Sequence, residues 1–148
     1  MIYGLYGTSK LVDTPPHVTE FGVNITTDDD EAKIIPEKTL KKLQCLVWLN
    51  IPSYAGGTVL WKHDDLSPCL MDDHKLEVVG LKDIKHVVAL TTNISSGVKL
   101  VQGSTFKITV DRECPIQVDG EPLLIGPSVI EISRLNQSRM IKKRDKTK

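Results

Sequence analysis

Residues 44–51 read QCLVWLNI, a near-continuous apolar run that ends directly before Pro52. A short apolar run with β-branched and aromatic residues, closed by a proline, is typical of a strand that is buried on both faces. Two further runs rich in β-branched residues follow, LEVVGL (76–81) and HVVALTT (86–92), and a short polar segment joins them. We expect both of these runs to be strands as well.

Later segments alternate apolar and polar residues. Residues 105–110 and 129–133 both show this pattern, which predicts strands with one buried and one exposed face. Helical signals are few, because residues 31–43 contain Pro36 and allow a turn or two at most. The polar run TTDDDEAK (26–33) is typical of a hairpin tip or loop. The sequence therefore predicts a mainly β, β-sandwich-like antiparallel domain of about eight or nine strands with little helix.

The 148 residues, 40% apolar and 26% charged, have the composition of a single globular domain. No apolar run approaches the ~18 residues of a membrane-spanning helix. Residues 1–10 lack the basic region and apolar run of a secretory signal peptide. Cys45, Cys69 and Cys114 are an odd number without metal-ligand spacing, which favours a reducing cytosol over a disulfide framework.

The net charge of zero conceals an asymmetry along the chain. Residues 139–148 carry six basic residues and one acidic residue, which leaves 13 basic and 18 acidic residues in positions 1–138. We therefore divide the chain into a β-rich domain, 1–138, and a basic C-terminal tail, 139–148. An acidic body with only 5% aromatic residues argues against nucleic-acid binding. The tail is either a solvated terminus or a peripheral contact with an anionic membrane.

Three segments contain residue types that carry chemistry. In NIPSYAGGT (50–58) a glycine pair follows a strand, but no Lys-Ser or Lys-Thr comes after it, which favours a tight connection over a phosphate loop. LSPCLMDDHKLEV (66–78) offers carboxylates beside main-chain oxygens, the ligands of Mg²⁺ or Ca²⁺, although the residues alone favour a solvated turn. In PIQVDGEP (115–122), Asp119-Gly120 predicts a tight turn. Glu121 directly after it makes the turn either an ordinary hairpin or an acid–base site.

These segments, taken together, resemble one known family. The resemblance is to the accessory domain of eukaryotic diacylglycerol kinases, and it covers nearly the whole chain. The segments that carry it, in order, are YGTSK (6–10), LNIPSYAGGTVLW (49–61), DDHKLEVVGL (72–81), GVKLVQGSTFKIT (97–109), PIQVDGEP (115–122) and NQSRMIKK (136–143).

The resemblance implies a lipid kinase that uses ATP and Mg²⁺ to phosphorylate diacylglycerol to phosphatidic acid. In this family an α/β half carries a Gly-Gly-Asp-Gly-Thr loop for ATP, a β-sandwich forms the second half, and the active site lies between them. The present sequence contains no Gly-Gly-Asp-Gly-Thr. We therefore expect the accessory half of such an enzyme, inactive without its α/β partner. The resemblance implies a cytoplasmic, peripherally membrane-associated location for the full enzyme.

The resemblance also implies roles for individual residues. Asp119, Gly120 and Glu121 match the acidic turn that reaches the nucleotide across the cleft. Glu121 matches a residue proposed as the proton acceptor in bacterial relatives, so it is the expected catalytic residue. Leu123 stands where the family often has tryptophan.

The same resemblance implies a structural Mg²⁺ loop. Its ligands would be the main-chain oxygens of Leu70 and Lys75 and the carboxylate of Asp73. His74 replaces the glycine that is usual in this loop.

Two other functions are compatible with the residues. One is a non-catalytic β-sandwich module that binds a lipid kinase or a lipid surface. The other is an unrelated metal-dependent hydrolase that uses the carboxylates of residues 72–74 and 119–121, which would require one pocket to hold both clusters.

Overall fold

A computed structural model describes residues 16–27, 33–54, 57–62, 67–92 and 95–136. The described residues form nine strands, two short α-helices and a 3₁₀ turn at Val18–Phe21. The strands are β1 (Asn24–Thr27), β2 (Lys33–Ile34), β3 (Cys45–Leu49), β4 (Leu76–Leu81), β5 (Val98–Gly103), β6 (Thr105–Val110), β7 (Cys114–Val118), β8 (Glu121–Ile125) and β9 (Ser128–Ser133). The helices are α1 (Glu37–Leu40) and α2 (Ile84–Thr91).

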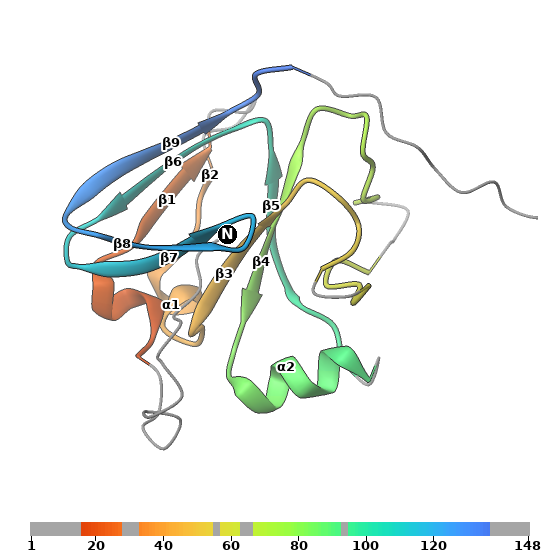
Figure 1. Cartoon of the computed structure of the whole chain (residues 1–148), viewed down its shortest axis with the longest axis horizontal. Coiled ribbons are helices and arrows are strands. Elements are labelled where there is room, and N and C mark those ends of the chain that lie inside the picture. Colours follow the sequence, from red (N-terminus) through yellow and green to blue (C-terminus); the bar gives the residue numbers. More distant parts are fainter. Residues whose placement is uncertain (1–15, 28–32, 55–56, 63–66, 93–94, 137–148) are drawn as a thin grey trace, which may run out of the picture.

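The strands form three antiparallel sheets, ordered β2-β1-β6-β9, β3-β4-β5 and β7-β8 (Figure 1). This arrangement confirms the mainly β, sandwich-like prediction with little helix. The pairing of β1 with β2 also confirms a hairpin around the polar run at 26–33, although residues 28–32 lie outside the described part. The four-residue α1 agrees with the turn or two expected near Pro36.

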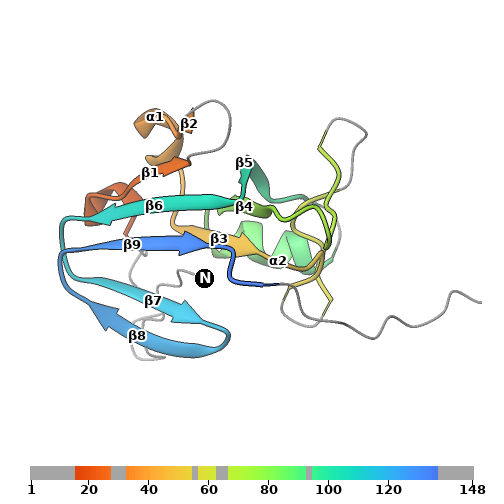
Figure 2. The same cartoon turned by 90° about the horizontal axis from the view of Figure 1, so that it is seen from above.

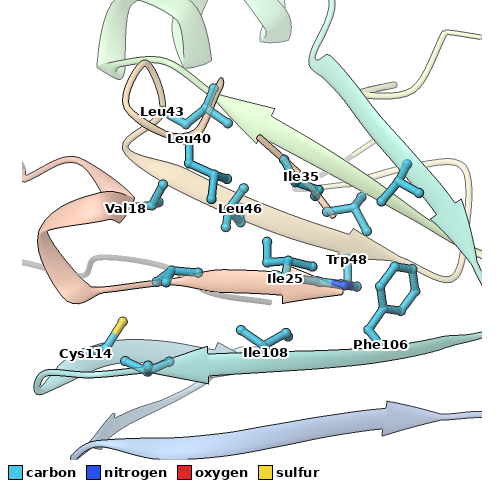
Figure 3. Close-up of a cluster of buried hydrophobic side chains, with 14 residues drawn as sticks. Val18, Ile25, Ile35, Leu40, Leu43, Leu46, Trp48, Phe106, Ile108 and Cys114 are labelled. Atoms are coloured by element: carbon cyan, nitrogen blue, oxygen red, sulfur yellow. The ribbon is translucent and has the colours of Figure 1, made fainter. Parts of the chain in front are cut away.

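β3 is buried on both faces, as its apolar run predicts, because successive side chains point to opposite sides. Leu46 and Trp48 point into the main core, between β3-β4 and the four-stranded sheet (Figure 3). Val47 and Leu49 point the other way, into a second core that includes Leu90 of α2. The middle sheet therefore lies between the four-stranded sheet on one side and α2 on the other.

The prediction of a strand at 86–92 is wrong, because most of these residues belong to helix α2. Asp83 caps the helix, since its side chain accepts a hydrogen bond from the His86 amide at 2.7 Å. The helix buries one face, with Leu90 2% exposed and Val88 58% exposed. Within the described residues no helix is long and apolar enough to cross a membrane.

The His86 ring fixes the position of α2 against the neighbouring segments. The Lys82 amide donates to Nδ1 at 3.2 Å, so Nε2 carries the proton and donates to the Ser96 carbonyl at 2.9 Å. One imidazole thus joins the start of the helix to the segment that leads into β5. These contacts give a structural role to a histidine on a largely apolar helix.

Candidate functional site

The β7–β8 hairpin carries the acidic turn, residues 119–121. Val118 pairs with Glu121, so Asp119 and Gly120 form the entire two-residue loop. Both residues have positive φ, 47° and 100°, the combination that matches the right-handed twist of a β-hairpin. The tight turn predicted from Asp119-Gly120 is therefore confirmed, and it places the two acidic residues on either side of Gly120 at the hairpin tip.

The hairpin extends beyond the main core, and in Figure 2 it diverges from β9 toward its tip. Along one face of β7, burial falls from Cys114 at 1% exposed, through Ile116, to Val118 at 52%. Leu123, paired with Ile116 on the same face, is 51% exposed. Asp119, Gly120 and Glu121 are exposed at the tip. The turn thus stands on an apolar arm that the described residues leave uncovered.

The backbone of the proposed metal loop is left-handed at one residue. His74 has φ of 66°, a conformation that glycine adopts most readily. Asp73 Oδ1 accepts a hydrogen bond from the Lys75 amide at 3.1 Å, which holds the carboxylate against the loop.

No group of three or more His, Cys, Asp or Glu side chains suited to a metal occurs in the described segments. One carboxylate with two main-chain oxygens is nevertheless a donor set that fits Mg²⁺, because this ion usually retains several waters. The residues of the loop, Leu70, Asp73 and Lys75, are therefore compatible with the ion, and the assignment stays a prediction.

Glu77 at the start of β4 is a buried carboxyl that the sequence analysis did not single out. It is 1% exposed, and its Oε1 accepts a hydrogen bond from Gln102 Nε2 at 3.1 Å. Gln102 Nε2 also donates a hydrogen bond to the Pro68 carbonyl at 2.9 Å. The Cys69 thiol forms a hydrogen bond with the Glu77 carboxyl. Glu77 therefore ties the metal loop to β5. The available signal was its polar character within the apolar run LEVVGL.

Burial raises the pKa of the Glu77 carboxyl from its ordinary value of 4.5, although the bonds from Gln102 and Cys69 oppose the shift. Between 4.5 and the raised value, the folded chain binds more protons than the unfolded chain, so stability falls as pH rises. Glutamine cannot ionise and retains an acceptor for Gln102. We expect the stability of Glu77→Gln, relative to the wild type, to increase as the pH rises above 4.5.

Denaturant unfolding of both chains across this pH range measures the difference. Glu113→Gln, at an exposed position, is the matched control and should follow the wild type throughout. If the difference between Glu77→Gln and the wild type is constant with pH, Glu77 does not titrate abnormally in the folded chain.

Gly57 lies in a tight connection, as the glycine pair at 56–57 predicts. Tyr54 and Thr58 form an isolated antiparallel bridge, and Gly57 between them has φ of 106°. The structure describes no residue of 55–56.

A groove beside the metal loop is lined by His74 and Lys75 and by no residue of the acidic turn. This groove therefore does not join the two acidic clusters that the hydrolase hypothesis requires.

The fold and the exposed hairpin define a β-sandwich domain that presents an acidic turn outward. The family model described as diacylglycerol kinase accessory domain matches residues 1–122. The chain belongs to this family.

Known relatives agree with the family model. Human diacylglycerol kinase theta is 37% identical over 100 residues, 66% of this chain. Human diacylglycerol kinases iota and zeta are each 36% identical over 118 residues, 77% of this chain. The matched segment makes up only 11–12% of the length of these relatives. No solved structure shows a significant match.

Proposed function

We propose that this chain is the accessory half of an ATP-dependent diacylglycerol kinase, which converts diacylglycerol to phosphatidic acid. The observation that carries the proposal is the acidic turn, a two-residue turn at the exposed tip of a hairpin in a domain of this family. Asp119, Gly120 and Glu121 are exposed there, where a second domain can close over them.

Phosphoryl transfer depends on positioning and charge neutralisation more than on covalent chemistry by the protein. ATP with Mg²⁺ supplies the transferable phosphoryl group and the neutralising charge. In our proposal Glu121 accepts the proton of the diacylglycerol hydroxyl. The hydroxyl oxygen bonds to the γ-phosphorus of ATP as the bond between that phosphorus and the oxygen bridging to the β-phosphate breaks. Asp119 and the Gly120 amide contact the nucleotide, and Leu70, Asp73 and Lys75 hold a structural Mg²⁺.

The proposed partner is an α/β half that carries the phosphate loop. Val118 and Leu123, on one face of the hairpin, are 52% and 51% exposed, and an exposed apolar surface of this kind is typical of an interface. We propose that the α/β half covers this arm and brings its bound nucleotide to the acidic turn. We further propose that the assembled enzyme acts in the cytoplasm at a membrane surface, where its lipid substrate lies.

The test compares the chain alone with the chain joined to a matching α/β half. Purified protein is incubated with labelled ATP, Mg²⁺ and diacylglycerol micelles. We expect phosphatidic acid only from the joined protein, because these 148 residues contain no Gly-Gly-Asp-Gly-Thr loop. Enzymatic turnover by the chain alone, lost in Glu121→Ala, would contradict the accessory role. Stable binding to the α/β half without any phosphate transfer would instead favour the non-catalytic module.

A further inference from the structure

A groove of about 410 Å³ lies where strands of the two larger sheets end. Asn50 follows β3, Lys75 precedes β4, Ser104 joins β5 to β6, and Arg134 follows β9, and all of them line it. Residues from four separate parts of the chain therefore meet here because of the fold. The groove is distinct from the acidic turn, which contributes no residue to it.

The groove is suited to an anion. Two basic residues, Lys75 and Arg134, line it, and so do three residues whose side chains can donate hydrogen bonds, His74, Asn50 and Asn136. None of the described residues that line it is acidic. Asp73, in the same loop as His74 and Lys75, accepts a hydrogen bond from the Lys75 amide at 3.1 Å. Arginine and lysine together are typical of phosphate sites.

The groove also has an apolar part. Ile51 and Met71 line it and are 46% and 50% exposed, and Leu135 joins them. An inorganic anion gains nothing from apolar side chains, whereas a phospholipid presents a phosphate and hydrocarbon together. We propose that this groove binds the phosphate group of a phospholipid, with the start of its acyl region against these apolar side chains.

Binding to vesicles tests the proposal without any kinase assay, so its result is independent of the proposed function. The full chain is sedimented with phosphatidylcholine vesicles, with the same vesicles containing phosphatidic acid, and in competition with free glycerol phosphate. We expect binding only to the vesicles with phosphatidic acid, and little competition by glycerol phosphate. Full competition by glycerol phosphate at matched phosphate concentration would overturn the lipid assignment.

The variant Lys75→Gln/Arg134→Gln tests the groove itself. Because each basic residue near an anionic surface contributes on the order of 1 kcal/mol, we expect binding to weaken roughly thirtyfold. Lys42→Gln/Lys85→Gln removes the same charge at exposed positions outside the groove and should change binding little. Lys75→Arg/Arg134→Lys keeps both charges and should retain binding. Equal loss in both glutamine variants would show that net charge alone drives binding and would contradict the proposal.

The basic tail, residues 139–148, lies outside the described residues and needs its own control. The groove variants are therefore repeated in a Lys142→Gln/Lys143→Gln background. The loss caused by Lys75→Gln/Arg134→Gln should persist there, with unchanged thermal melting of the folded chain. If that loss disappears in this background of reduced tail charge, the groove is not the binding site.

Discussion

We expect Glu121→Gln to lower the turnover of the joined kinase by ~10²–10⁴-fold, the usual loss when a positioned general base is removed. Glutamine keeps the size and the hydrogen-bonding capacity of glutamate but cannot accept the proton of the attacking hydroxyl. Because Glu121 is exposed at the hairpin tip, the change should leave thermal melting unaltered. The assay is steady-state turnover and nucleotide affinity at equal concentrations of folded protein.

Two neighbouring substitutions separate charge from backbone shape. Asp119→Asn should weaken nucleotide binding without distorting the turn, because asparagine tolerates the positive φ of 47° at this position. Gly120→Val should lower turnover severely, but for a different reason. A Cβ there would meet only Gln117 Nε2 at 3.9 Å, so the cost comes from the φ of 100°, not from crowding.

Asp72→Asn is the matched control, an exposed carboxylate outside the acidic turn, and should keep wild-type turnover. If Glu121→Gln and Asp119→Asn both behave like this control, the turn is an ordinary hairpin. That result would refute the site assignment while leaving the family membership intact.

The second large effect concerns stability. Trp48 of β3 lies between the two larger sheets, 8% exposed, with its ring edge-to-face against Phe106 at a centroid distance of 6.3 Å (Figure 3). We expect Trp48→Ala to lower the free energy of unfolding by ~3–5 kcal/mol, because the cavity cannot close between two packed sheets. Chemical denaturation measures this loss, and Ile34→Ala, at a side chain 67% exposed, is the control.

Trp48→Phe should lower the free energy of unfolding much less than Trp48→Ala does. Within the described residues the buried Nε1–H of Trp48 has no hydrogen-bond partner, and leaving such a donor unpaired costs ~1–3 kcal/mol. Phenylalanine removes that donor while retaining most of the apolar contact with Phe106. A phenylalanine variant as unstable as the alanine variant would indicate that Nε1 does find a partner in solution.

The sequence predicted the features that depend on local pattern. The run at 44–51 became a strand buried on both faces, and Asp119-Gly120 became a two-residue turn, because residue type alone determines each. Residues 86–92 are rich in β-branched residues, which favours a strand, but they form a helix that the Asp83 side chain caps. The spacing of Val87 and Leu90 on one helix face fits α2 better than an alternating strand.

Features that combine distant segments were not predictable. The buried Glu77 carboxyl accepts its hydrogen bond from Gln102, 25 residues later. The groove forms where strand ends from four parts of the chain meet, which happens only in the folded chain. The exposure of the β7–β8 arm likewise depends on where the main core ends, because Cys114 and Val118 are both apolar residues of one strand face. No periodicity in the sequence distinguishes the buried residue from the exposed one.

The pairing of β1 with β6 also constrains how the chain acquires its structure during synthesis. Thr26 and Lys107, paired across these strands, are separated by 81 positions. At ribosomal rates of 5–20 residues per second, β1 waits about 4–16 s for its partner. Ile25 and Thr27, 1% and 2% exposed in the folded domain, are uncovered during that interval. Closing so long a loop is entropically costly, so assembly of the four-stranded sheet is a late and slow step.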